Sequence, residues 1–207
     1  MPSDENPLAS DDPAQWDRLI DAIEPASMLL AIRGRMGPAV RDRYLEEDVW
    51  QDVLLQAWRA RKQVEWRGHG AFRRWLLQIA ENCVRGLLDH DRAQKRGGGV
   101  APQPLSRGHS EFAGPTDSTT PSRVAADREL AAHMEQVLAE LLPEDRDVLR
   151  LRSFESLSLE ETAARLGLSL SAVRHRFRRG VTAFEHRLRQ LRRQSSFRGA
   201  DSTASGS

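Results

Sequence analysis

A long segment poor in apolar residues divides the chain and most constrains what it can fold into. Of the 29 residues from 97 to 125, 16 are Gly, Pro, Ser or Thr. Such a segment buries too little apolar surface to offset the entropy lost on ordering, and it is too long for an ordinary loop. We therefore expect a flexible linker between two folded domains, residues 13–96 and 126–193. Composition also predicts disordered termini at residues 1–12 and 194–207.

Both domains show the periodicity of helices. Residues 46–62 and 71–96 carry apolar side chains three and four positions apart, and glycines in the intervening "VEWRGHG" indicate a loop. An earlier segment predicts two shorter helices that divide near Pro25, and residues 126–193 predict four helices. No convincing alternation typical of a strand is found. The sequence predicts an all-α fold of two small helical domains joined by a flexible linker, each with a modest core.

The last two predicted helices have the signature of a helix-turn-helix. Ser158 and Glu161 have the spacing of a capping box, which starts a helix at the next residue, and Gly167 suits the left-handed position after its end. Ser169 can cap a second helix that begins at Leu170. Two short helices joined by a three-residue turn containing glycine match the motif.

Phasing this second helix at about 100° per residue separates an apolar face from a basic one. Val173 and Phe177 belong to the apolar face. The opposite side carries the residues expected to contact DNA: Ser171, Arg174, His175, Arg178 and Arg179. Arginine pairs with guanine edges and with phosphates through the same bidentate geometry. No Cys or His lies at ligand spacing from His175, so no metal site is predicted.

The distribution of charge indicates an anionic partner, although the formal net charge is only +1. Residues 1–24 hold seven acids and one arginine, whereas residues 174–193 hold eight arginines and one acid. The single cysteine, Cys83, cannot form an internal disulfide, and its apolar neighbours favour a buried structural thiol. Neither a signal peptide nor a membrane-spanning stretch is recognisable, so we expect a cytoplasmic protein that does not insert into membranes.

The sequence around the helix-turn-helix, "LLPEDRDVLRLRSFESLSLEETAARLGLSLSAVRHRFRRG", closely resembles region 4 of bacterial sigma factors of the extracytoplasmic-function (ECF, sigma-70 family) group. Upstream, "EEDVWQDVLLQAWRA" resembles region 2.2, and "FRRWLLQIAENCVRGLLDHDRAQKR" resembles regions 2.3 to 2.4. The resemblance implies a protein that binds core RNA polymerase and directs promoter-specific initiation. Region 4 would read the −35 element of promoter DNA and region 2 the −10 element. An anti-sigma factor is a further partner that the family allows.

The resemblance also assigns roles to residues of the first domain. Region 2.2 implies polymerase contacts through one helix face: Asp48, Gln51, Asp52 and Leu55. Regions 2.3 to 2.4 and the preceding loop imply contacts with the −10 strand: Trp66, Phe72, Arg73, Arg74, Trp75, Asn82, Arg85 and Arg92. Phe72 and Trp75 are also in phase with the core, which leaves a purely structural role open for both. Asp89 and Asp91 make this region less basic than in most relatives.

Two other classes of function stay open on the residues alone. A conventional helix-turn-helix transcriptional regulator would use residues 13–96 for sensing or dimerisation. A serine recombinase or nuclease would need a catalytic unit, and the sequence offers no serine on a strand with arginine partners, no acidic cluster at metal spacing and no glycine-rich phosphate loop. We therefore predict a protein that is not an enzyme and that needs no cofactor.

Overall fold

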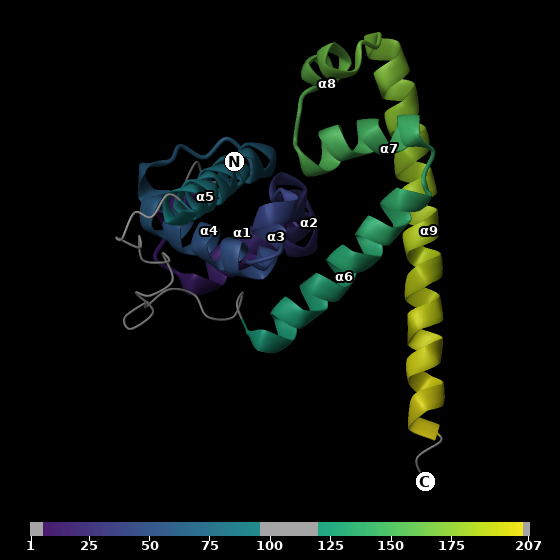
Figure 1. Ribbon diagram of the computed structural model, residues 1–207, viewed down its shortest axis with the longest axis horizontal. Coiled ribbons are helices and arrows are strands. Elements are labelled where there is room, and N and C mark those ends of the chain that lie inside the picture. The colour runs from purple at the N-terminus through teal and green to yellow at the C-terminus, as the bar shows by residue number, and fades with distance from the viewer. Residues whose placement is uncertain (1–5, 96–119, 205–207) are drawn as a thin grey trace, which may run out of the picture. The chain divides into compact units, whose positions relative to one another are not determined.

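The computed structural model describes the backbone of residues 6–95 and 120–204 and the side chains of residues 6–92 and 120–193. Regular structure in these ranges is entirely helical, which confirms the predicted all-α class (Figure 1). The chain divides into two compact units, Met1–Arg128 and Glu129–Ser207. Most of the predicted linker, residues 97–119, lies outside the described ranges, as do residues 1–5 and 205–207 of the two termini.

Unit 1 is a helical bundle around α2, α4 and α5. Its elements are η1 (Pro7–Ala9), α1 (Pro13–Ala22), α2 (Pro25–Arg35), α3 (Pro38–Arg41), α4 (Glu46–Ala60), η2 (Arg61–Gln63) and α5 (His69–Lys95). The predicted division at Pro25 is confirmed, because proline occupies the first turn of α2 and fits there without losing a hydrogen bond. The core is apolar, with Ile32, Val53 and Leu76 fully buried where the three central helices pack together.

The prediction of a disordered N-terminus is wrong for residues 6–12, which we call the N-terminal strap. Leu8 of the strap is only 1% exposed, and Asp12 caps α1 by accepting from the backbone N–H of Ala14 at 3.0 Å. The carboxylate of Asp11 forms ion pairs with Arg61 and Lys62. Composition could not indicate this order, because one apolar anchor and partners some 50 residues away hold the strap.

Unit 2 contains α7 (Pro143–Leu149), a π-helical turn η5 (Arg150–Phe154), α8 (Leu159–Leu166) and α9 (Leu170–Ala204). Helix α6 (Pro121–Glu140) leads into it and begins before residue 126, where we expected the linker to end. The four predicted helices are confirmed, whereas η5 was not predicted. Val148, Ala163 and Val173 form the core between α7, α8 and α9, with Leu159, Leu166, Leu168 and Phe177 packed around them.

The backbone of α9 continues to Ala204, so the prediction of a disordered tail is wrong for residues 194–204. The helix can extend because no proline follows Gly180, and most residues up to Arg198 have good helix propensity.

The predicted caps of the helix-turn-helix are confirmed. Ser158 Oγ accepts from the N–H of Glu161 at 3.1 Å, and a Glu161 carboxylate oxygen accepts from the N–H of Ser158 at 2.6 Å. Gly167 has a φ of +64°, which glycine adopts without the steric cost of a β-carbon. Ser169 Oγ then accepts from the N–H of Ala172 at 3.2 Å and starts α9. The sequence therefore fixes the turn between α8 and α9 locally.

Helix α9 approaches α7 closely at Gly180. A β-carbon at this position would lie 3.2 Å from the carbonyl oxygen of Asp145, tighter than ordinary van der Waals contact. Next to it, Arg179 donates from Nε and Nη2 to the two carboxylate oxygens of Asp145, at 2.6 and 2.8 Å. The Asp145 side chain is 4% exposed, and its hydrogen bonds raise the pKa of the Arg179 guanidinium. This bidentate pair holds α9 against α7.

Replacing Asp145 with alanine should lower the free energy of unfolding of unit 2 by about 1–3 kcal/mol, because it removes two charge-assisted hydrogen bonds at the junction. Asp147→Ala is the matched control, since that side chain is 47% exposed and lies 3.9 Å from Arg146. Urea unfolding followed by circular dichroism measures both variants. All five tryptophans precede residue 76, so tryptophan fluorescence reports unit 1 alone. Equal effects of the two substitutions would contradict this account of the junction.

Candidate nucleic-acid interface

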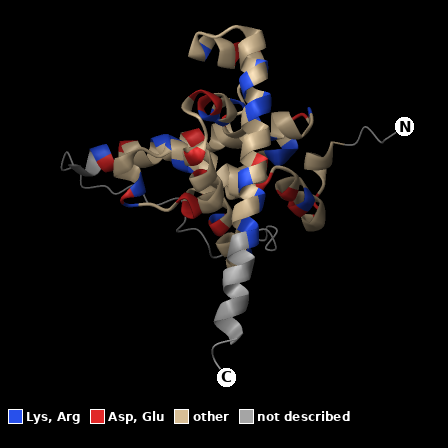
Figure 2. Ribbon diagram, turned by 90° about the vertical axis from the view of Figure 1, so that its right-hand side faces the viewer, with Lys and Arg blue, Asp and Glu red and all other residues tan. Residues whose placement is uncertain are grey.

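The N-terminal half of α9 presents a basic face to solvent. Ser171, Arg174, His175 and Arg178 are exposed there, while Val173 is fully buried on the opposite side. Basic residues continue along the helix (Figure 2). The phasing is therefore confirmed for these four residues. Recognition helices enter the major groove through this part of the helix, and arginine contacts both bases and phosphates.

Arg179 is exposed on the same side of the helix, as expected, but its guanidinium is already paired with acids of α7. Its guanidinium is held by Asp145, and Nη2 also donates to a Glu144 carboxylate oxygen at 3.4 Å. Helical phasing could not detect this contact, because it gives the direction of a side chain and not the partner, which lies 34 residues earlier. Arg179 therefore positions α9.

Sequence reasoning missed Arg152, which η5 places beside the basic face. A shallow hollow of about 330 Å³ is lined there by Arg152, Leu159, Arg174, Phe177 and Arg178. The Arg152 guanidinium carbon lies 5.4 Å from the centre of the Phe177 ring, and Nη1 donates to the carbonyl oxygen of Leu157 at 2.5 Å. Three guanidinium groups around an apolar floor suit a phosphate group. No local pattern in the sequence indicated this, because the π turn sets the direction of Arg152.

In unit 1, one exposed face of α5 collects four of the predicted contacts with single-stranded DNA: Arg74, Asn82, Arg85 and Arg92. Their spacings of eight, three and seven residues place them on the same side of a helix. Arg85 pairs with Glu81 at 3.0 Å and Arg92 with Asp89 at 3.5 Å. Exposed pairs of this kind contribute little to stability, so phosphate can replace the carboxylates at small cost.

Two further predicted contacts, Phe72 and Arg73, lie on the inner side of α5, and their prediction as DNA contacts is wrong. Phe72 is buried, with its ring edge-on to Trp16 at 5.9 Å. Arg73 Nη1 donates to the carbonyl oxygen of Ile23 at 2.9 Å and to Ser27 Oγ at 2.8 Å. Burial lowers the pKa of Arg73 to about 10. Both residues attach α5 to the α1–α2 junction.

Trp66 and Trp75 lie against the buried Phe72 and are themselves only partly buried. Each ring centre is 5.9 Å from that of Phe72, and Trp66 also meets His69 at 5.2 Å. The buried ring of Phe72 therefore supports the partly exposed rings of Trp66 and Trp75. Partly exposed indole rings can stack on unpaired bases, an interaction worth roughly 1–3 kcal/mol per base.

Asp91 is a structural residue and does not dilute the charge of the exposed face. It is buried, and Arg43 Nη1 donates to its carboxylate at 2.7 Å. The hydroxyl of Tyr44 approaches the same oxygen at 3.5 Å. This contact fixes the C-terminal part of α5 to the residues just after α3, whereas Asp89 is exposed.

The predicted polymerase contacts share one face of α4. Asp48 and Gln51 are exposed there, and Asp52 and Leu55 are partly buried. The other acids of the first turn are engaged differently, since Glu46 pairs with Arg33 at 3.0 Å and Glu47 is buried.

Cys83 is a buried thiol, as predicted. Gln56 Nε2 lies 3.2 Å from its sulfur, and burial raises the pKa of the thiol to about 11. In the described residues, no group of three His, Cys, Asp or Glu side chains could hold a metal ion. No helix in the same ranges is long and apolar enough to cross a membrane.

Comparison with known proteins adds the decisive observation. Residues 133–184 match the family model described as "Sigma-70, region 4". The chain is also 30% identical over 164 residues to the RNA polymerase sigma factor CarQ of Myxococcus xanthus, a match that covers 77% of this chain and 84% of CarQ. The chain belongs to the sigma-70 family of RNA polymerase sigma factors.

Further relatives agree and indicate the ECF group. This sigma factor is 31% identical over 157 residues to the RNA polymerase sigma-H factor of Pseudomonas aeruginosa, covering 75% of this chain and 79% of the relative. It is 27% identical over 165 residues to the ECF RNA polymerase sigma factor SigE of Mycolicibacterium smegmatis. That match covers 80% of this chain and 58% of SigE. The region 4 match includes α7, η5, α8 and the basic N-terminal half of α9.

Replacing Arg73 with alanine should lower the free energy of unfolding of unit 1 of this sigma factor by about 1–3 kcal/mol, since it removes the hydrogen bonds of a largely buried guanidinium to the Ile23 carbonyl and to Ser27 Oγ. The neighbouring exposed Arg74→Ala should change it by no more than about 0.5 kcal/mol. Urea unfolding followed by tryptophan fluorescence measures unit 1. A loss of stability in the Arg74 variant as large as in the Arg73 variant would refute the structural assignment.

Proposed function

We propose that this sigma factor binds core RNA polymerase through unit 1 and directs it to promoters through DNA contacts of both units. The observation that carries the proposal is a capped helix-turn-helix with an exposed basic face, in the segment that matches region 4. The names of the curated relatives support a role in transcription initiation by RNA polymerase. Polymerase and promoter DNA would place its action in the cytoplasm.

Unit 2 reads the −35 element through α9. Ser171, Arg174 and Arg178 enter the major groove, where the guanidinium groups pair with guanine edges or with phosphates. Arg152 holds a phosphate in the adjoining hollow, while Arg179 keeps α9 in place through Asp145. His175 lies on the same exposed face and contacts the groove or its edge.

Unit 1 holds the −10 strand. Trp66 and Trp75 supply stacking surfaces for an unpaired base, and the buried Phe72 packs against both. Arg74, Asn82, Arg85 and Arg92 contact the strand backbone from the exposed face of α5. Extrusion of a base costs a few kcal/mol, which these contacts offset.

The face of α4 with Asp48, Gln51, Asp52 and Leu55 docks on the polymerase. Two acids and an amide beside a half-buried leucine suit a basic partner surface with an apolar centre. An anti-sigma factor would inactivate this sigma factor by covering this face or the basic face of α9.

The test is transcription in vitro with purified core RNA polymerase on a library of randomised promoters. We expect the wild-type chain to support initiation and to select −35 and −10 sequences. Asp48→Lys together with Asp52→Lys should abolish initiation, because two like charges then meet the basic partner surface. Asp42→Lys, an exposed charge change at the end of α3, is the control and should retain activity.

The same experiment separates this function from that of a conventional regulator. A regulator would bind duplex DNA alone and would not associate with core polymerase in gel filtration. Full transcription by the Asp48→Lys and Asp52→Lys variant would disprove the docking face on α4 without affecting the role in initiation.

Arg178→Ala should weaken binding of the polymerase complex to the selected −35 DNA by about 1–3 kcal/mol if the arginine reads a base. If it contacts phosphate, the slope of log affinity against log salt should fall by about 1. Arg187→Ala is the control, because that side chain lies nine residues further along α9 and within 3.8 Å of Glu140. Unchanged affinity and salt slope for the Arg178 variant would remove it from the interface.

A further inference from the structure

The N-terminal strap reaches the segment that carries Trp66. Asn6 Nδ2 donates to the carbonyl oxygen of Val64 at 2.9 Å, two residues before this tryptophan. Asn6 Oδ1 accepts from the N–H of Leu8 at 3.0 Å, and the buried Leu8 anchors the strap. A hydrogen bond between residues 58 positions apart therefore joins the start of the strap to the start of the loop that leads from Val64 to α5.

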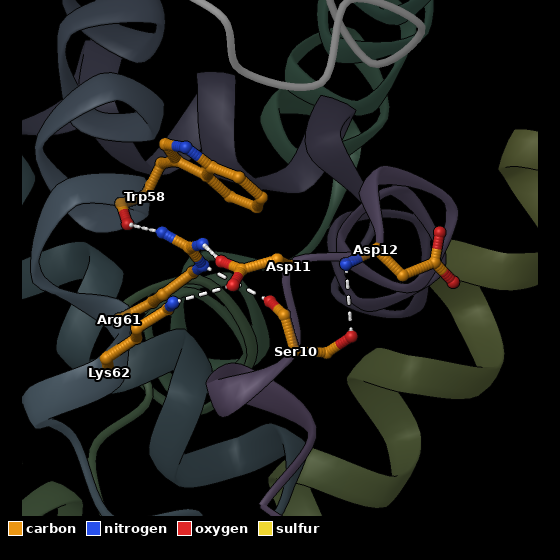
Figure 3. A network of polar contacts seen from close by, with 6 residues as sticks. All are labelled: Ser10, Asp11, Asp12, Trp58, Arg61 and Lys62. Atoms are coloured by element: carbon orange, nitrogen blue, oxygen red, sulfur yellow. Dashed lines mark hydrogen bonds and ion pairs between the residues drawn. The ribbon is translucent and has the colours of Figure 1, made fainter.

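Asp11 fastens the other end of the strap to η2 (Figure 3). Its two carboxylate oxygens accept from Arg61 Nη2 at 2.5 Å and from Lys62 Nζ at 2.7 Å. Arg61 Nε also donates to the carbonyl oxygen of Ser10 at 3.4 Å. The lysine and the arginine lower the pKa of Asp11, with the hydrogen bond from Lys62 as the largest cause.

Arg61 also contacts the aromatic residues of unit 1. Its side chain is 8% exposed, and its guanidinium carbon lies 3.4 Å from the centre of the Trp58 ring (Figure 3). Trp16, which follows the strap in α1, meets Trp58 edge-on at 5.3 Å and Phe72 at 5.9 Å. Phe72 in turn supports Trp66. A continuous series of contacts therefore leads from Asp11 to the ring of Trp66.

We propose that the N-terminal strap is a positioning element of the −10 site, which holds Trp66 in the orientation that stacks on an unpaired base. The strap fixes the loop through Val64 and η2 through Arg61, and Trp16 supports Phe72 from behind. The loop needs such support, because it ends at Gly68 with a φ of +86°, a residue that permits many backbone conformations. A ring held in place before binding loses less entropy when the base arrives.

The proposal rests on the proposed function, since it assigns a role to the strap in DNA binding by unit 1. A double-mutant cycle tests it with full-length variants assembled on core RNA polymerase. The probe is a fluorescently labelled single strand that carries the −10 sequence recovered from the promoter library. The variants are Asn6→Ala with Asp11→Ala, Trp66→Ala, and all three substitutions together.

Trp66→Ala should weaken binding of the single strand by roughly 5- to 150-fold, as expected for a lost stacking contact. The strap variant should weaken it by about 3- to 10-fold, a part of the same stacking contribution. In the Trp66→Ala background the strap substitutions should have no further effect, because the ring that they orient is absent.

Arg18→Ala is the control, since it removes an exposed ion pair of 3.6 Å with Asp12 and leaves η2 untouched. It should bind the strand like the wild type. Wild-type affinity in the strap variant would overturn the proposal, as would an equal loss with and without Trp66. A strap variant whose unit 1 is unfolded by tryptophan fluorescence would also overturn it, since the strap would then be part of the fold alone.

The cycle also distinguishes a failure of the proposed −10 role of Trp66 from a failure of the strap proposal. If Trp66→Ala binds the strand normally, the stacking role of Trp66 is refuted and the strap proposal with it. If only the strap predictions are contradicted, the −10 role of unit 1 stands.

Discussion

Arg179 and Asp145 meet where α9 packs tightly against α7 at Gly180, and the placement of the basic face of α9 depends on this contact. A small helical unit buries little apolar surface, so a bidentate ion pair on a buried carboxylate contributes much to the orientation of its helices. Arginines also connect separate helical segments in unit 1. Arg73 bonds to the carbonyl of Ile23, and Arg43 reaches the buried Asp91. Guanidinium groups that cross between helices fix both units.

The arginines of this protein therefore divide into two groups that sequence composition cannot separate. Arg73 and Arg179 have buried acceptors on other helices, and their positive charge serves the fold. Arg74 and Arg178 are their immediate sequence neighbours and lie exposed, where the charge is available to DNA. Consecutive residues on a helix point about 100° apart, so one arginine of each pair reaches an acceptor on another helix while the next points in a different direction.

Local signals predicted much of the fold. The capping box at Ser158, the left-handed Gly167 and the proline at the start of α2 each depend on residues a few positions apart, and all were confirmed. Prediction was wrong where the deciding partner is distant in sequence. The strap depends on Arg61 and Val64, which lie about 50 residues further along the chain.

Periodicity likewise gave an incomplete account of the candidate sites. It correctly predicted the exposed face of α9 that carries Arg174, His175 and Arg178, because burial follows the helical repeat. It could not show that the π turn directs Arg152 towards Phe177, since that depends on an irregular backbone. Phe72 was ambiguous on phase alone, and its contacts with Trp16 settle its place in the core.

The continuity of α9 has a mechanical consequence. Because the backbone is helical from Leu170 to Ala204, the end that carries the basic face and the opposite end belong to one helix of about 52 Å. The junction at Gly180 lies about a third of the way along it. Gly180 divides the helix into an arm of about 15 Å that carries Arg174 and Arg178 and an arm of about 36 Å, so a rotation about this point moves the end of the long arm about twice as far as the end of the short arm.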